Sequence, residues 1–324
     1  MIRPARLRTR DVLRNVLTDI HLSASKLVSP LFVRMGTGIK KEIPTLPGHF
    51  QWSPDMLVGH VETLLNCGIQ QVLLFGIPEY KDEKGSAAYL ETGVIQEALK
   101  ALEPLKNDLV IITDVCFCEY TNHGHCGQLS PCESQGRLDM EATCDMIALQ
   151  ALSHAQAGSQ VIAPSGMVDG MVAAIRTKLD QNGFGHIPIL SYAVKYASQF
   201  YGPFRAAAEG APKEGDRRSY QCDYRRMHEW QLETDLDVKE GADMLMVKPA
   251  GYYLDVIHQI KYRYPEIPLY SYQVSGEYAM IKKAVSAGLV HEKAIEESLI
   301  GIFRAGADCV ITYFAQEVAR RLKQ

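Results

Sequence analysis

Short apolar runs recur eight times along this chain, and each is followed by a longer stretch with apolar residues at helical spacing. The runs are rich in valine, isoleucine, leucine and tyrosine and are mostly apolar on both faces, which is typical of strands in a covered parallel sheet. They occupy residues 27–34, 71–78, 109–116, 160–166, 187–195, 244–250, 267–275 and 309–315. This alternation limits the possible folds more than any other feature of the sequence.

Eight strand-then-helix units in 324 residues predict an α/β fold of the (β/α)8 TIM-barrel type. Helical stretches such as 53–68 and 140–158 end at a glycine, as helices often do. A doubly wound sheet is the alternative, but it usually has fewer strands and a glycine-rich phosphate turn, and the sequence has no such motif. We therefore predict one barrel domain over residues 26–324, preceded by an N-terminal arm over residues 1–25.

Composition and charge exclude several functional classes. The net charge of −4 does not favour nucleic acid or an anionic membrane as a partner. No apolar run reaches the roughly 18 residues of a transmembrane helix, and the N-terminal residues lack the apolar segment of a secretory signal. Eight cysteines in 324 residues are too few for a disulfide scaffold, and clustered cysteines are then more often metal ligands or redox groups. We predict a cytoplasmic protein.

Two lysines end adjacent predicted strands. Lys195 ends the run "SYAVK" and Lys248 ends "MVK", at the barrel face where active sites lie. A single lysine in such a place is most often ion-paired or snorkelling. Two lysines in an apolar mouth lower each other's pKa, and a neutral amine can attack a ketone to form a Schiff base. The pair predicts an enzyme that handles two carbonyl molecules, whereas one lysine would suggest a class I aldolase.

The segment "DVCFCEYTNHGHCG" (114–127) follows the third run and predicts a metal site. Cys116, Cys118 and Cys126 have the spacing C-x-C-x7-C, without the paired C-x-x-C knuckles of a zinc ribbon. Three thiolates without an obvious fourth ligand leave an open coordination position, which is the pattern of a catalytic zinc site. His123 and His125 are candidate fourth ligands, unless they only shape the turn. A redox role for the thiols is the other alternative.

The remaining cysteines fall into two groups. Cys132 is near enough in sequence to join the cluster. The others are interpreted as buried or incidental thiols: Cys67, Cys144, Cys222 and Cys309.

The stretch "FYGPFRAAAEGAPKEGDRRSYQ" (200–221) is long, rich in glycine and proline, and basic. Loops of this kind after a barrel strand are usually functional lids. Arg205, Arg217 and Arg218 are candidates for clamping a substrate carboxylate, because the guanidinium group binds carboxylates in a bidentate fork. The alternative is a solvated surface loop.

Several motifs together resemble the porphobilinogen synthase family, also called 5-aminolevulinate dehydratase. They are "DVCFCEYTNHGHCG", "SYAVKYASQFYGPFR", "GDRRSYQ", "MLMVKPAGYYLD" and "YQVSGEYAM". The similarity runs from "RPARLR" near the N-terminus to "ITYF" near the C-terminus. Members of that family are barrel enzymes of heme and tetrapyrrole biosynthesis that join two 5-aminolevulinate molecules into porphobilinogen and release two waters.

The resemblance implies a role for each matching residue. Lys248 matches the lysine that holds the propionate-side substrate as a Schiff base, and Lys195 matches its acetate-side partner. The residues matching those that bind the acetate-side carboxylate are Arg205, Arg217 and Gln221. The residues matching those that bind the propionate-side carboxylate are Ser275 and Tyr313. The zinc ligands of the zinc-dependent branch match Cys116, Cys118 and Cys126.

The resemblance also bears on a second metal and on assembly. Ser219 stands where some members have a further cysteine, which argues against a second zinc site there. Glu233 matches a glutamate that binds an allosteric Mg²⁺ in many bacterial members, although its neighbours "HEWQLETD" depart from the usual pattern. Members build homo-octamers through their N-terminal arm. Near the lysines, Asp114, Ser165 and Tyr192 are candidates for assisting proton transfers.

The arm itself supports a role in assembly. Residues 1–25 interleave arginines with apolar residues such as Leu7, Val12 and Val16, and they have no place inside a barrel. A disordered basic tail is the alternative. For the whole chain, the alternatives are a class I Schiff-base aldolase with a structural zinc site, and a non-catalytic zinc-binding module. Neither accounts for two lysines and a basic loop together.

Overall fold

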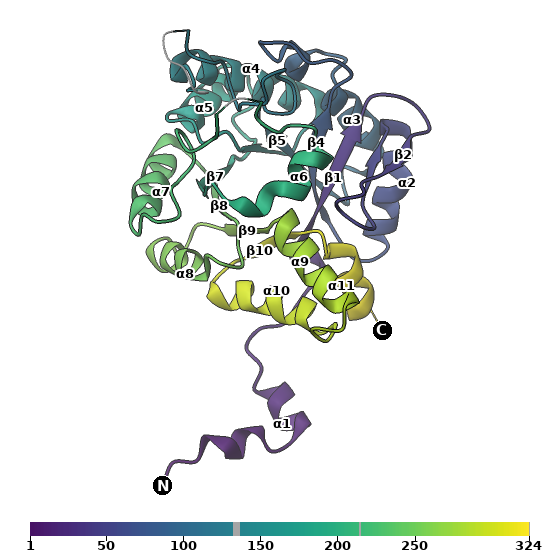
Figure 1. Ribbon diagram of the computed structural model, residues 1–324, viewed down its shortest axis with the longest axis vertical. Coiled ribbons are helices and arrows are strands. Elements are labelled where there is room, and N and C mark those ends of the chain that lie inside the picture. Colours follow the sequence, from purple (N-terminus) through teal and green to yellow (C-terminus); the bar gives the residue numbers. More distant parts are fainter. Residues whose placement is uncertain (132–136, 214, 324) are drawn as a thin grey trace.

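The computed structural model describes residues 1–131, 137–213 and 215–323. Eight parallel strands form the centre of the molecule, and helices lie around them (Figure 1). The predicted barrel is therefore confirmed. Its strands are β1 (Leu27–Arg34), β4 (Gln71–Ile77), β5 (Val110–Val115), β6 (Val161–Pro164), β7 (Leu190–Lys195), β8 (Met244–Lys248), β9 (Leu269–Gln273) and β10 (Cys309–Thr312).

Hydrogen-bonded pairing runs in the order β6-β5-β4-β1-β10-β9-β8-β7. The circle closes between β6 and β7, where an isolated parallel bridge joins Ile162 to Ile189 and the Ile162 N–H donates to the Pro188 carbonyl at 3.1 Å. Nearly every strand residue is buried, because inner side chains fill the barrel and outer ones pack under the helices.

The outer layer consists of helices that follow the strands. The longest, α4, begins after Asp139, whose carboxylate accepts the Ala142 N–H at 3.1 Å, and ends at Gly158 with φ 108°. The helices are α2 (Pro54–Leu65), α3 (Val94–Leu102), α4 (Met140–Ala157), α5 (Met171–Gln181), α6 (Gly202–Ala207), α7 (Glu229–Glu240), α8 (Leu254–Arg263), α9 (Ser275–Ser286), α10 (Ala294–Ala305) and α11 (Ala315–Leu322). Across the described ranges, every helix is too short or too polar to span a bilayer.

Two features go beyond the expected alternation. A small hairpin of β2 (Lys40–Glu42) and β3 (Phe50–Trp52) follows β1, and β3 pairs with the end of β1. Two helices, α9 and α10, separate β9 from β10. The hairpin extends the wall of the barrel at the face where the strands end.

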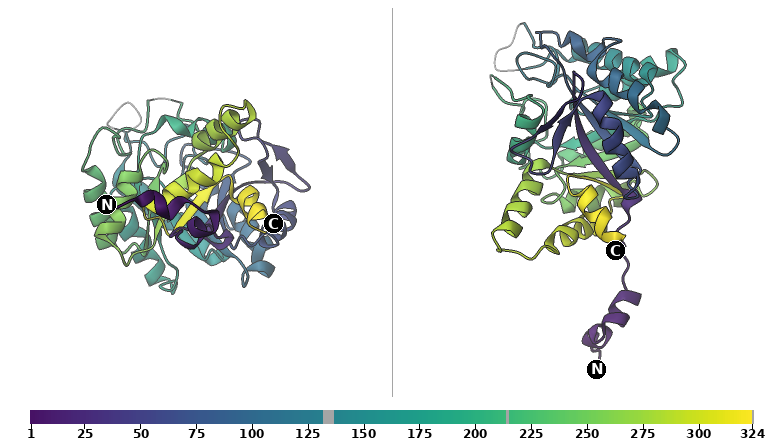
Figure 2. Two further views of the ribbon diagram at one scale, coloured as in Figure 1. Left: turned by 90° about the horizontal axis from the view of Figure 1, so that it is seen from below. Right: turned by 90° about the vertical axis from the view of Figure 1, so that its right-hand side faces the viewer.

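The N-terminal segment stands away from the barrel (Figures 1 and 2). It contains a 3-10 helix, Pro4–Arg8, and a short helix, α1 (Asp11–Val16), and neither has a buried residue. The segment joins β1 at its N-terminal end, so it leaves the barrel at the face opposite the strand ends that carry the lysines.

Candidate active site and metal centre

Several of the predicted site residues line one small cavity at the C-terminal face of the barrel. Its wall combines strand ends with the segment after β7. The lining residues are Phe75, Cys118, Glu119, Ser165, Lys195, Tyr201, Phe204, Arg205, Arg217 and Lys248. A larger hollow lies outside the barrel between β3, α2 and α11, and neither lysine nor any of the clustered cysteines lines it.

Lys248 ends β8 and is 4% exposed. Its Nζ lies 4.3 Å from the centre of the Tyr272 ring and 5.0 Å from that of Tyr192. The rings of Phe75, Tyr201 and Phe204 lie within 6.0 Å as well. Aromatic faces attract a cation, but they also keep water away from it.

Burial lowers the pKa of Lys248 to about 7, and the charge of Lys195 acts in the same direction. Asp114 opposes this shift, but desolvation is the larger effect. An ordinary lysine at pH 7 is almost entirely protonated. Lys248 is therefore an amine whose nucleophilic, neutral form is well populated near pH 7.

Lys195 ends the neighbouring strand, β7, and its Cα pairs in register with that of Lys248. Its Nζ donates to the Ser165 backbone carbonyl at 2.6 Å. The Ser165 hydroxyl in turn donates to Asp114 at 3.1 Å. Asp114 is buried beside both lysines, and burial raises its pKa. The second lysine is thus held by the ends of β5 and β6, at the base of the cavity.

The three predicted zinc ligands lie together. The sulfur atoms of Cys116, Cys118 and Cys126 are all within 4.8 Å of one another, and all three residues are buried. The Cys116 and Cys118 sulfurs are 3.4 Å apart. Hydrogen bonds with these two thiols lower the pKa of Cys126 well below its usual value, and nearby Arg217 and Lys195 act in the same direction. The cluster is a candidate metal site at the edge of the lysine cavity.

The candidate fourth ligands point elsewhere. His123 Nε2 contacts the Glu83 carbonyl at 3.3 Å, and its Nδ1 accepts the His125 backbone N–H at 3.1 Å. His125 Nδ1 lies 3.1 Å from the Tyr220 hydroxyl. Neither ring joins the cysteine group.

The other described cysteines do not join it either. Cys132 lies outside the described residues. The remaining ones are free thiols spread over the fold: Cys67, Cys144, Cys222 and Cys309.

The basic segment after β7 covers the cavity. Arg205, on α6, and Arg217 both line it, and Arg217 is 5% exposed. The Arg217 guanidinium donates to the carbonyls of Gly124, at 2.9 Å, and Gly210, at 2.6 Å. Arg218 is exposed, faces away and pairs with Asp216. The structure therefore separates the three arginines into two at the cavity and one at the surface.

The remaining predicted substrate ligands do not line this cavity. Gln221 is buried, and its side-chain amide has no hydrogen-bond partner among the described residues. The Ser275 hydroxyl accepts the backbone N–H of Phe204 at 2.9 Å. The Tyr313 hydroxyl lies 3.2 Å from that of Tyr272, the ring closest to Lys248.

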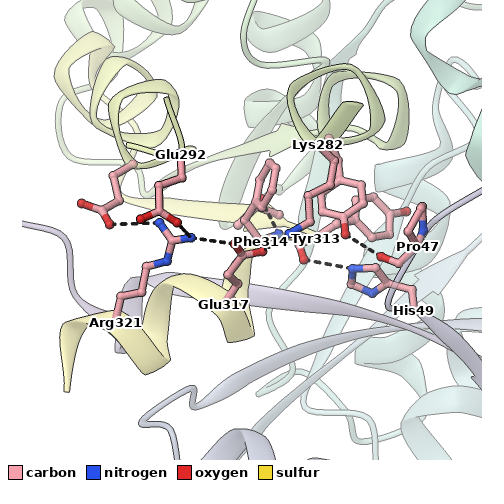
Figure 3. A network of polar contacts seen from close by, with 11 residues as sticks. Pro47, His49, Lys282, Glu292, Tyr313, Phe314, Glu317 and Arg321 are labelled. Carbon is pink, nitrogen blue, oxygen red and sulfur yellow. Dashed lines mark hydrogen bonds and ion pairs between the residues drawn. The ribbon is translucent and has the colours of Figure 1, made fainter. Parts of the chain in front are cut away.

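The loop between β2 and β3 contacts the backbone of Tyr313. Its carbonyl accepts from His49 Nε2 at 3.0 Å (Figure 3). Burial lowers the pKa of His49 to about 4, so the ring is neutral and Nε2 donates. Tyr278 donates to the Pro47 carbonyl at 2.7 Å and fixes the same loop. The hairpin region thus sets the position of Tyr313.

Glu233 lies on α7, away from the cysteines and lysines. It borders a small hollow together with Asp169, Asp237 and Glu240. Burial raises the pKa of Glu233 to about 7, and the neighbouring carboxylates, Asp169 first, add to the shift.

The carboxylate in the cavity lining was not predicted from the sequence. Glu119 is 2% exposed and lines the cavity next to Cys118. Burial raises its pKa to about 7, and the charge of Asp114 adds to this effect. The only indication in the sequence was its position directly after the predicted metal ligand Cys118.

Comparisons with known proteins agree on one family. The family model for delta-aminolevulinic acid dehydratase matches residues 1–321. The delta-aminolevulinic acid dehydratase of Synechocystis sp. is 47% identical over 323 residues, covering 99% of this chain and 98% of that protein. The protein of that name from Archaeoglobus fulgidus is 48% identical over 322 residues, with the same coverage.

A solved structure extends the likeness to three dimensions. It is the Toxoplasma gondii ME49 delta-aminolevulinic acid dehydratase (porphobilinogen synthase) in complex with the reaction product porphobilinogen. The TM-score is 0.94 at 37% identity, and the match covers 99% of this chain and 91% of the other.

Proposed function

Because the chain belongs to the delta-aminolevulinic acid dehydratase family, it condenses two 5-aminolevulinate molecules into porphobilinogen, and we propose that Lys248 and Lys195 hold them as Schiff bases. The observation that carries this proposal is the in-register pair of buried lysines at one cavity. A single-Schiff-base aldolase would need only one of them.

In the proposed mechanism, the neutral amine of Lys248 attacks the ketone carbon of the first substrate. A C–N bond forms, and the C–O bond breaks as the oxygen leaves as water with one proton from the amine and one from solvent. The resulting iminium stabilises a carbanion on the adjacent carbon. The lowered pKa of Lys248 supports this role, because its neutral form is available without strong base. Lys195 forms the equivalent iminium with the ketone of the second substrate.

Proton transfers are assigned to the carboxylate and hydroxyl groups at the base of the cavity. Asp114 is buried next to Lys195 and accepts the Ser165 hydroxyl proton at 3.1 Å. It is placed to take a proton from a carbon beside the iminium, with Ser165 and Tyr192 assisting. Burial and the charge of Asp114 raise the pKa of Tyr192, so its hydroxyl keeps its proton and can donate it.

The substrate carboxylates are assigned to the ligands that the family resemblance implies. Arg205 and Arg217 at the cavity support the acetate-side assignment, and Gln221 lies buried with both amide atoms unpartnered. Ser275 and Tyr313 are proposed for the propionate side. The Ser275 hydroxyl accepts the backbone N–H of the cavity residue Phe204, and the Tyr313 hydroxyl lies 3.2 Å from that of Tyr272.

The cysteine cluster fits a zinc ion. Three buried sulfurs within 4.8 Å of one another, one favoured as thiolate, are a suitable donor set for this soft divalent metal. We assign Cys116, Cys118 and Cys126 as its ligands. When bound there, zinc would polarise a substrate carbonyl or ligate water or the substrate amine. A carboxylate at Glu233 is a separate candidate for an allosteric Mg²⁺, since three other acidic residues border the same hollow.

Assembly and location complete the proposal. The exposed N-terminal arm is proposed to pack on a neighbouring copy in a homo-octamer, because its apolar residues are uncovered in the single chain. A cytoplasmic location is consistent with cysteines that are all free thiols in the described part of the chain.

The decisive experiment traps the covalent intermediates. Borohydride added with 5-aminolevulinate should reduce the iminium and attach substrate mass to the peptide that contains Lys248. A protein that makes the pyrrole, detected with Ehrlich's reagent, but never carries this label would contradict the Schiff-base assignment.

A further inference from the structure

Two side chains from other parts of the barrel hold the backbone of the segment that covers the cavity. Gln51, on β3, is buried, and its Nε2 donates to the Ala207 carbonyl at 2.8 Å. Lys81, in the loop after β4, donates through Nζ to the Glu209 carbonyl at 2.6 Å. Both contacts lie at the C-terminal end of α6, the helix that carries the cavity residue Arg205. Neither of the two side chains lines the cavity itself.

The end of α6 needs such partners, because the last four carbonyls of a helix lack donors within the helix. The backbone supplies one donor here, since the Ala208 N–H donates to the Phe204 carbonyl at 2.8 Å. The carbonyls of Ala207 and Glu209 take their donors from the two side chains. Glu209 also has φ 54°, a left-handed conformation that residues other than glycine adopt only where neighbouring contacts hold it.

The two anchoring side chains are themselves held by other residues. Gln51 Oε1 accepts from Arg34 Nη1 at 2.5 Å, and the same nitrogen lies 4.0 Å from Glu209 Oε1. Arg34 ends β1. Burial lowers the pKa of Lys81, whereas the charges of Glu119 and Glu209 act in the opposite direction and favour the protonated amine. The end of α6 is therefore tied to the ends of β1 and β4, which belong to the rigid barrel wall.

Arg205 depends on this backbone for its position. Its Nε is buried and has no hydrogen-bond partner among the described residues. Arg217 differs, because its guanidinium is fixed by two backbone carbonyls. The place of the Arg205 guanidinium in the cavity therefore follows from the place of α6.

We propose that Gln51 and Lys81 are positioning residues that hold α6 over the cavity and thereby direct Arg205 at a substrate carboxylate. This inference rests on the function proposed above for Arg205. Because neither anchor lines the cavity, each acts on substrate binding through Arg205 and leaves the chemistry at Lys248 unchanged.

The test uses the full-length protein and matched variants. Gln51→Glu keeps the size of the side chain and the oxygen that accepts from Arg34, but it removes the N–H donor. Lys81→Met keeps most of the stem and removes the ammonium group, and Lys81→Arg restores a charged donor. Lys84→Met, at an exposed lysine of the same loop, is the control. Arg205→Ala gives the effect of losing the carboxylate ligand itself.

Two quantities are measured: steady-state kinetics with 5-aminolevulinate, and backbone hydrogen exchange without substrate. KM should rise about two- to ten-fold in Gln51→Glu and in Lys81→Met, which is the worth of one hydrogen bond. The value of kcat should change little, because lost binding that is shared by ground and transition states raises KM alone. Exchange should become faster over residues 200–210 and stay unchanged in β8. Lys81→Arg and Lys84→Met should match the wild type.

The possible failures are distinguishable. Wild-type KM and exchange in the double variant Gln51→Glu, Lys81→Met would overturn the role of the anchors. Faster exchange in β8 as well as in residues 200–210 would show a general loss of stability and would also overturn it. An unchanged KM in Arg205→Ala would instead overturn the proposed carboxylate ligand on which the inference rests.

Discussion

Lys195 and Lys248 are paired in register across the adjacent parallel strands β7 and β8. Side chains at paired positions of parallel strands point to the same face, so both amines reach one cavity. The charge of Lys195 raises the cost of protonating Lys248, in addition to the cost of burial.

Lys248→Arg should abolish nearly all pyrrole formation. A guanidinium stays protonated at any working pH and cannot attack a ketone, although it keeps the positive charge and much of the volume. Activity is measured with Ehrlich's reagent and folding by circular dichroism. Substantial turnover by a folded variant would show that Lys248 is not the nucleophile.

The rate of Schiff-base formation should rise with pH around neutrality. Lys248 has a lowered pKa of about 7, so its neutral fraction grows as pH increases through that value. The neutral fraction increases about ten-fold between pH 6 and 8 for such a pKa, and an unshifted lysine would stay almost fully charged. The profile of kcat/KM against pH checks this, since it reports groups of the free enzyme. A midpoint near the ordinary lysine value would contradict it.

Removing the metal should stop catalysis without unfolding the barrel. The cysteine cluster lies at the edge of a large core, so the fold does not depend on a single ion as small zinc domains do. A chelator should abolish activity and shift the thermal midpoint only slightly, and zinc should restore turnover. Full activity after chelation, or loss of the fold, would assign the cluster another role.

Arg217→Ala should raise KM about ten- to a hundred-fold. Losing one charge-assisted hydrogen bond to a carboxylate costs about 1.5–3 kcal/mol. Arg218→Ala is the matched control, because Arg218 is adjacent in sequence but exposed and paired with Asp216. Steady-state kinetics on both variants give the comparison. Equal KM values would mean that the segment after β7 does not clamp substrate.

Deleting residues 1–20 should reduce the size of the assembly. Leu7, Val12 and Val16 are 57%, 67% and 75% exposed in the single chain, and burying such side chains on a neighbour is favourable. Light scattering on the full-length and shortened proteins measures particle mass. The double variant Val12→Ser, Val16→Ser is milder than the deletion and should weaken the same contact. Unchanged mass and specific activity in all three proteins would exclude the arm from assembly.

The sequence was most informative where a residue's place follows from periodicity. Lys195 and Lys248 each end an apolar run. The C-terminal ends of all barrel strands lie at the same face, which is the face that carries active sites. Strand limits were less well predicted. The run 187–195 was expected to be strand throughout, but β7 begins at Leu190, because Pro188 has no N–H to donate to a ladder.

Other features could not be predicted because they depend on contacts between distant segments. The strand β2 is three exposed residues with no apolar alternation, and it forms only by pairing with β3. The burial of Glu119 follows from the packing of the segment after β7 over the cysteine loop, and its sequence neighbours do not indicate this. The roles of Ser275 and Tyr313 came from the family resemblance alone.

The closure of the barrel has a mechanical consequence. Between β6 and β7, the described backbone offers one bridge, Ile162–Ile189, and the Nζ of Lys195 adds a link across the same junction by donating to the Ser165 carbonyl. When Lys195 becomes an iminium, its nitrogen keeps a single N–H, and the double bond to the substrate carbon sets the direction of that N–H. Binding of the second substrate would then remove the hydrogen bond from Lys195 to the Ser165 carbonyl and weaken the junction between β6 and β7. Backbone amides near Ile162 should therefore exchange hydrogen faster once this substrate is bound.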